Sequence, residues 1–108
     1  MTGNIIILCN CGSNEEAQQV ARALVGQRLA ACVNILPGVY SVYRWQGEVE
    51  EAAEWTLIIK TQASRYAEVE AAIRELHSYT TPEIVAVKIE KGLPAYLDWI
   101  LEETSSLQ

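Results

Sequence analysis

Residues 31–61, ACVNILPGVYSVYRWQGEVEEAAEWTLIIKT, decide the fold. The first part, up to Trp45, predicts a long strand that bends at Pro37-Gly38, because proline has no N–H to donate to a central ladder. Gln46-Gly47 predicts a tight turn, since glycine tolerates positive φ. Residues 48–61 then return as the second arm. The stretch therefore predicts a β-hairpin with arms of about 14 residues, more than twice the usual strand length.

A strand and a helix precede the hairpin. Residues 4–10 are a short apolar, β-branched run and predict a buried strand. Ser13 and Glu16 have the spacing of a capping box, in which each side chain satisfies the other's free backbone N–H. We expect the helix to end near Arg28. Apolar residues follow the capping box at the three- and four-residue steps of one helical face: Ala17, Val20, Ala21, Leu24 and Val25.

A helix, a strand and a last helix follow the hairpin. Ser64 is the predicted N-cap of the first of these helices, and its pattern stops at His77. Pro82 favours an extended residue before it, and residues 83–90 predict the last strand. Leu93-Pro94 predicts the start of a terminal helix, because proline suits the first helical turn.

The resulting order is strand, helix, strand, strand, helix, strand and one extra helix. This order predicts a single α+β domain over residues 1–108 with the ferredoxin-like, split βαβ plan. We expect one antiparallel sheet with two helices on one face, together with the C-terminal helix.

The far end of the hairpin carries surplus apolar surface. The strands beside it are too short to flank both arms over their full length, so this end has no neighbour within its own domain. Apolar patches of this kind usually mark a partner surface. We therefore expect a homo-oligomer whose hairpins cross onto neighbouring subunits. The alternative is a hairpin that folds back on its own helices through the Pro37-Gly38 bend. The residues concerned are Val39, Tyr40, Val42, Tyr43 and Trp45.

The composition and net charge argue against binding to nucleic acid, adsorption to anionic lipid and spanning of a membrane. The chain of 108 residues has a formal net charge of −6, and its 8 Lys and Arg are scattered. Nucleic-acid binding needs a basic stripe, and an acidic surface does not adsorb to anionic lipid. No stretch approaches the ~20 apolar residues of a membrane span, and the first residues lack a basic leader. An odd count of 3 cysteines without a secretion signal favours a reducing cytoplasm.

The three cysteines are candidates for metal binding or for nucleophilic catalysis. Cys9 and Cys11 share one face of a strand, where a soft metal could bridge them. Two cysteines alone are not a zinc set, and buried free cysteine usually behaves as a small hydrophobe, which is the interpretation favoured here. A nucleophilic pair of Cys32 and His77 has neither an oxyanion-hole glycine cluster nor an evident orienting carboxylate. We therefore expect no enzymatic activity.

His77 is the single histidine of the chain. Its position suits a helix C-terminus, where the helix dipole favours a positive charge. The alternative is that His77 binds a metal ion or a small molecule. An imidazole with a carboxylate at Glu83 and a phenol at Tyr79 nearby suits Cu(II) or the anchoring of a small molecule.

Several motifs resemble the CutA divalent-cation tolerance proteins, and the similarity covers nearly the whole chain. They are LAACVNILPGVYSVYRWQGEVE at residues 29–50, Lys60-Thr61, HSYTTPEIV at residues 77–85 and YLDWI at residues 96–100. The resemblance implies a ferredoxin-like subunit, architecturally related to PII-type signalling proteins and assembled as a tight trimer through its hairpins. It also implies a cytoplasmic setting, or an organellar one in eukaryotic members, copper binding and a role in tolerance to divalent metals.

The resemblance also implies site residues. His77 corresponds to the family's histidine and is the expected copper ligand, assisted by Glu83 or a thiol, Cys32. The expected ligand-cleft residues are Trp45, Lys60, Tyr79 and Trp99. The chain has Ser78 where the family usually has a proline that would stiffen the helix exit, and no family role transfers to Cys9 and Cys11.

Two functions are therefore expected. The first is a cytosolic, homotrimeric, copper-binding protein of metal tolerance. The alternative is a PII-like trimeric sensor that binds a small organic molecule in clefts between its subunits, because ligand pockets combine aromatic walls with few polar anchors.

Overall fold

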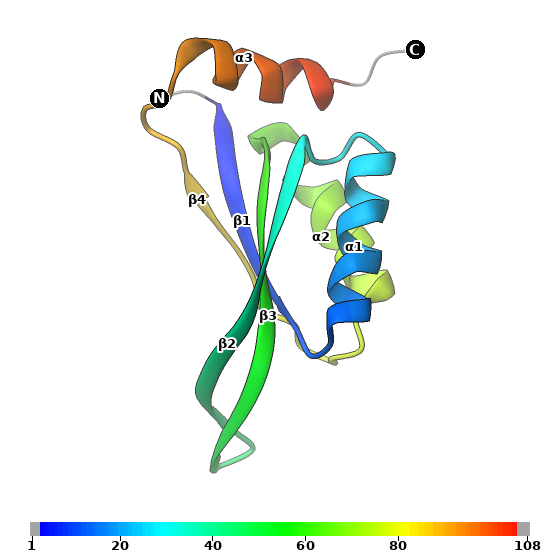
Figure 1. Ribbon diagram of the computed structural model, residues 1–108, viewed down its shortest axis with the longest axis vertical. Helices are drawn as coiled ribbons and strands as arrows, with labels where there is room; N and C mark the ends of the chain where they lie inside the picture. Colours follow the sequence, from blue (N-terminus) through cyan, green and yellow to red (C-terminus); the bar gives the residue numbers. More distant parts are fainter. Residues whose placement is uncertain (1–2, 106–108) are drawn as a thin grey trace.

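A computed structural model describes residues 3–105 as a four-stranded antiparallel sheet with the strand order β2-β3-β1-β4 (Figure 1). The two helices α1 and α2 lie side by side against one face of this sheet, and α3 lies across one end. None of the helices within residues 3–105 has the length and apolar character needed to span a bilayer. In chain order the elements are β1 (Asn4–Cys11), α1 (Asn14–Gly26), β2 (Cys32–Trp45), β3 (Glu48–Gln62), a 3₁₀ turn (Ala63–Arg65), α2 (Tyr66–Leu76), β4 (Ile84–Lys88) and α3 (Pro94–Glu103).

The core lies between the sheet and the pair α1 and α2. Alternate residues of β1 point to this side, because successive side chains of a strand point to opposite faces. On β1 these are Ile5, Ile7, Cys9 and Cys11, all buried. Buried apolar residues of α1, β3 and α2 complete the cluster. The predicted α+β fold, with the split βαβ order, is therefore confirmed.

Of the two predicted serine caps, one is confirmed and the other is wrong. Ser13 caps α1 as predicted, with its Oγ accepting a hydrogen bond from the Glu16 N–H at 3.1 Å. Ser64 does not cap α2, so that prediction is wrong. It lies within the 3₁₀ turn that precedes the helix, and its hydroxyl donates to Gln62 Oε1 at 2.9 Å instead. An N-cap needs an extended backbone, which a residue inside a helical turn does not have.

The hairpin has the predicted turn and bend. Gln46 and Gly47 both have positive φ, 53° and 84°, as a two-residue type I′ turn requires. The register of β2 against β3 shifts between Leu36 and Val39, which places a bulge at Pro37-Gly38.

The outer half of the hairpin projects beyond the rest of the sheet and does not fold back on the helices (Figure 1). β1 pairs with β3 only from Trp55 onward. Large apolar side chains on the unpaired half are therefore open to solvent in the single subunit. Tyr40 is 67% exposed and Val42 is 59% exposed.

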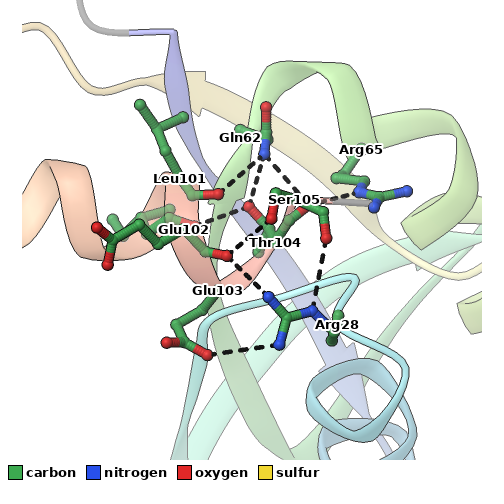
Figure 2. Close-up of polar contacts among 9 residues, drawn as sticks. Arg28, Gln62, Arg65, Leu101, Glu102, Glu103, Thr104 and Ser105 are labelled. Atoms are coloured by element: carbon green, nitrogen blue, oxygen red, sulfur yellow. Dashed lines mark hydrogen bonds and ion pairs between the residues drawn. The ribbon is translucent and has the colours of Figure 1, made fainter. Parts of the chain in front are cut away.

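Side chains from three other elements hold the C-terminal end of α3 (Figure 2). Arg28, which has a positive φ of 61°, donates from its guanidinium to the Glu102 carbonyl at 2.8 Å. Gln62 Nε2 donates to Thr104 Oγ1 at 2.8 Å, and Arg65 Nε donates to the Thr104 carbonyl at 2.8 Å. The last carbonyls of a helix have no partner within the helix, so these donors anchor α3 to the end of the sheet away from the hairpin tip.

Candidate metal centre

Cys9, Cys11 and His77 form a buried cluster on the helix-covered side of β1. The two thiols share this side because they are two residues apart on a strand. His77 follows directly after α2, and a nitrogen of its ring and the two Sγ atoms all lie within 4.8 Å of one another. A metal ion bonds these atom types at about 2.0–2.3 Å, so a modest contraction would let one ion bind all three.

Both nitrogens of His77 have partners in the metal-free protein. Nε2 lies 2.7 Å from the carbonyl oxygen of Asn10, the residue between the two cysteines. Nδ1 accepts a hydrogen bond from the Tyr79 N–H at 3.1 Å. Since a carbonyl oxygen only accepts, Nε2 donates its proton to Asn10.

The carboxylate of Glu16 faces the same ring. Its Oε2 lies 3.2 Å from His77 Nδ1. This buried oxygen gains a hydrogen bond only if Nδ1 carries a proton. A buried carboxylate oxygen without a donor is costly, and the chemistry that would relieve it is a cation or a proton at this position.

The thiol of Cys9 holds its proton firmly, because its pKa is raised well above the ordinary value. A hydrogen bond with Cys11 raises the pKa of Cys9, and burial and nearby negative charges raise it further. A metal ion therefore has to displace protons from the pair, as thiolate coordination generally requires.

The structure does not bring Glu83 to His77. Glu83 Oε1 accepts a hydrogen bond from Asn10 Nδ2 at 3.1 Å. The side chain of Asn10 points to the face of β1 opposite to that of Cys9 and Cys11, since side chains alternate along the strand. Glu83 therefore lies across the sheet from the cluster.

Cys32 is also remote from His77. It pairs with Lys60 of β3, which in turn pairs with Ile6 of β1. Cys32 thus lies two strands away from Ile6, roughly 10 Å at the usual strand spacing, and Cys9 is a further three residues along β1, roughly 10 Å. Its Sγ contacts Asn34 Oδ1 at 3.8 Å. The thiols that reach His77 are the pair on β1, which sequence reasoning assigned to the core.

A second feature is a cleft of about 620 Å³ between the hairpin and the loop that follows α2. Aromatic rings and carboxylates dominate its lining. Trp45 and Tyr79, two of the four predicted cleft residues, belong to it. The full lining is Asn10, Ser41, Val42, Tyr43, Trp45, Glu50, Glu54, Ser78, Tyr79, Thr80, Thr81 and Glu83.

The other two predicted cleft residues lie elsewhere in the single subunit. Lys60 donates a hydrogen bond to Asn34 Oδ1 on β2. Trp99 is on α3, at the end of the sheet away from the hairpin tip, and its ring stacks on Tyr96 with centroids 5.4 Å apart.

Tyr79 lies between the cluster and the cleft. Its ring centroid is 4.7 Å from that of His77. Its hydroxyl donates to Glu54 Oε2 at 2.9 Å, and Glu54 is only 6% exposed. Burial raises the pKa of Tyr79 to about 12, with the hydrogen bond to Glu54 adding to the effect.

Known proteins match the chain over nearly its whole length. A family model described as CutA1 divalent ion tolerance protein matches residues 5–103. The divalent-cation tolerance protein CutA of Thermus thermophilus is 48% identical over 99 residues, which cover 92% of this chain and 96% of that protein.

Solved structures agree with the sequence match. The divalent cation tolerance protein (Cut A1) of Thermus thermophilus superposes with a TM-score of 0.93 at 47% identity, covering 94% of this chain and 99% of that one. A structure from Archaeoglobus fulgidus, titled periplasmic divalent cation tolerance protein CutA, has a TM-score of 0.92 at 43% identity, with coverage of 94% and 99%.

Replacing Tyr79 with Phe is expected to change how stability falls at high pH. The pKa of about 12 in the folded protein exceeds the value of about 10 of a free tyrosine. The stabilisation is therefore complete below about pH 10 and is lost as the pH rises through about 12. Urea unfolding between these two pH values, at one chain concentration, should show a smaller loss of stability in the variant than in the wild type.

The wild type and the Tyr79→Phe variant differ only in the phenol hydroxyl of residue 79. Tyr66 and Tyr96, whose pKa values are also raised by burial, are present in both proteins. Stability curves that run parallel over this pH range would contradict the assignment to Tyr79.

Proposed function

Because the chain belongs to the CutA1 family of divalent ion tolerance proteins, we propose that it binds a metal ion through Cys9, Cys11 and His77 and acts in metal tolerance. The observation that carries the proposal is the buried cluster, in which three ligand atoms of metal-binding type lie within 4.8 Å of one another. The buried carboxylate oxygen of Glu16, 3.2 Å from His77 Nδ1, supports it, since it would add negative charge next to a bound cation.

Copper is the metal that we propose. Thiolate ligands are soft and favour Cu(I), and imidazole also suits copper. Zinc prefers four ligands in a structural site, and the cluster supplies three. Glu83 and Cys32 have no part in this ligand set, because they lie on other parts of the sheet.

Removing one ligand at a time is expected to abolish tight binding. The variants are C9S, C11S and H77Q, and each leaves at most two of the three donors. Cu(I) should bind the wild type at one ion per chain in competition with a chromophoric chelator under anaerobic conditions, and each variant should bind at least tenfold more weakly. A parallel titration with Zn(II) identifies the preferred metal.

C32S is the matched control. It removes the one thiol outside the cluster, so its copper affinity should equal that of the wild type. Loss of binding in C32S, with retention in C11S, would show that the cluster is not the site.

We also propose that the chain assembles as a homotrimer through its hairpins. The outer half of the hairpin exposes Tyr40 and Val42 and has no further strand beside it in its own subunit. Exposed apolar patches of this kind usually mark partner surfaces.

V42E is expected to weaken assembly, because it places a charge on this apolar surface. Native mass spectrometry of the wild type should give three times the chain mass of 12.0 kDa, and the variant should give smaller species. V25E is the control, since Val25 is exposed on α1 away from the hairpin. An unchanged mass for V42E would exclude this face from the interface.

A small organic ligand in the cleft is the second candidate function. The cleft volume of about 620 Å³ is within the range of small-molecule sites, and aromatic rings that could hold a ligand form part of its wall. The carboxylates Glu50, Glu54 and Glu83 favour a ligand with a positive charge.

A thermal-shift screen of metabolites that includes organic amines tests this function. A hit should be weakened by E50Q, which changes the cleft lining, and unaffected by E48Q, which changes the next residue on the same face of β3. A screen without hits on the assembled protein, or a hit that is insensitive to E50Q, would leave metal binding as the function.

We propose a binding role without catalysis, in a cytoplasmic setting. Cys9 and Cys11 are fully buried, so a substrate would not reach the thiols. Free thiols persist in a reducing compartment, and all the cysteines of the chain are free.

A further inference from the structure

We infer that the cleft between the hairpin and the loop after α2 binds an extended aliphatic polyamine, whose ammonium groups pair with a row of carboxylates along β3. The inference rests on the second candidate function, because it names the ligand class of the same cleft. The carboxylates of the row, all of which line the cleft, are those of Glu50, Glu54 and Glu83.

Glu54 is the buried member of this row. It is only 6% exposed, and it lines the cleft. Its one hydrogen bond within residues 3–105 comes from the Tyr79 hydroxyl, which donates to Oε2 at 2.9 Å. The other oxygen, Oε1, has no partner among these residues. A buried carboxylate is costly unless it is paired, and a cation in the cleft would pair with this oxygen.

The carboxylates are spread along the strand. Glu50 and Glu54 are an even number of residues apart, so their side chains share one face of β3. At the usual rise their Cα atoms are ~13 Å apart, and side chains of a strand stand roughly perpendicular to the sheet. One ammonium group therefore does not pair with both carboxylates. A ligand that pairs with both carries at least two positive charges on an extended chain.

Glu83 continues the row beyond Glu54. Its Oε1 accepts a hydrogen bond from Asn10 Nδ2 at 3.1 Å, and Asn10 Oδ1 accepts one from Thr56 Oγ1 at 2.7 Å. Thr56 is the next residue after Glu54 on the same face of β3. The carboxylates thus follow the line of the strand, as the ammonium groups of a linear polyamine follow its chain.

The same spacing argues against a single hard metal ion in the cleft. Calcium and magnesium bind their oxygen ligands at about 2.0–2.6 Å. Carboxylates that are ~13 Å apart along a strand cannot share one such ion.

The remaining lining suits an organic cation. Tyr43 pairs with Glu50 across the two strands, so ring and carboxylate are neighbours on one face of the hairpin. With Trp45 and Tyr79 it gives the cleft aromatic faces, which attract organic cations and can cover the methylene groups between them. Among the described residues that line the cleft, none is a lysine or an arginine, so no side-chain cation in the lining competes for the carboxylates.

Calorimetric titration of the assembled protein with spermidine, a linear triamine, tests the inference at constant ionic strength. Spermidine should bind the wild type, and E54Q and E50Q should each weaken binding roughly tenfold or more, the scale of a lost hydrogen bond to a charged group. E54Q keeps a side-chain oxygen that can accept from Tyr79. E50Q changes an exposed residue, so it tests the row even if E54Q does not fold.

E51Q is the matched control. It removes the same charge from the residue next to Glu50, on the opposite face of β3, where Glu51 accepts a hydrogen bond from Tyr40. Its affinity for spermidine should equal that of the wild type. Butylamine, which has one ammonium group, should bind the wild type at least about tenfold more weakly than spermidine.

Each outcome decides a separate point. Spermidine binding that is insensitive to E50Q and E54Q, or that falls equally in E51Q, would reveal general attraction to an acidic surface and overturn the inference. Butylamine that binds as tightly as spermidine would overturn it as well. A metabolite other than a polyamine that binds in an E50Q-sensitive manner, without binding of spermidine, overturns the inference alone. A cleft that binds neither spermidine nor any other metabolite overturns the second candidate function together with the inference.

Discussion

The alternation of side chains along β1 is the constraint on which the rest of the structure depends. β1 is a central strand, and its backbone pairs with β3 along one edge and with β4 along the other. Its inward residues complete the core and end in the two thiols. Its outward residues include Asn10, which accepts from Thr56 at 2.7 Å and donates to Glu83 at 3.1 Å. At its C-terminal end, β1 thus separates the two thiols on one face from the polar side chain of Asn10 on the other.

The segment that leaves α2 links these two faces. His77 reaches the backbone of β1 between the cysteines, while Tyr79 lines the cleft and donates to Glu54. The Tyr79 N–H and the His77 ring share a hydrogen bond. A change in the protons of His77 therefore alters a contact of the loop that forms one wall of the cleft, and the two candidate sites are not independent.

Much of the fold followed from local pattern. The hairpin, its turn at Gln46-Gly47 and the helix cap at Ser13 are set by residues close together in sequence. The cap at Ser64 could not be predicted correctly, because the preceding 3₁₀ turn depends on tertiary contacts. For the candidate site, the sequence indicates His77 as a ligand and places Cys9 and Cys11 on one face of a strand. Their meeting depends on how α2 packs against β1, and no short-range pattern contains that.

Ser78 shows how the same local geometry can be held by different means. A proline at this position would favour an extended conformation at the residue before it. His77 has that conformation without the proline, with φ −80° and ψ 140°. The hydrogen bonds of its two ring nitrogens to Asn10 and Tyr79 hold the ring in its place. Ser78 lacks the fixed φ of proline, so in this chain these hydrogen bonds, rather than a proline ring, fix the conformation at His77.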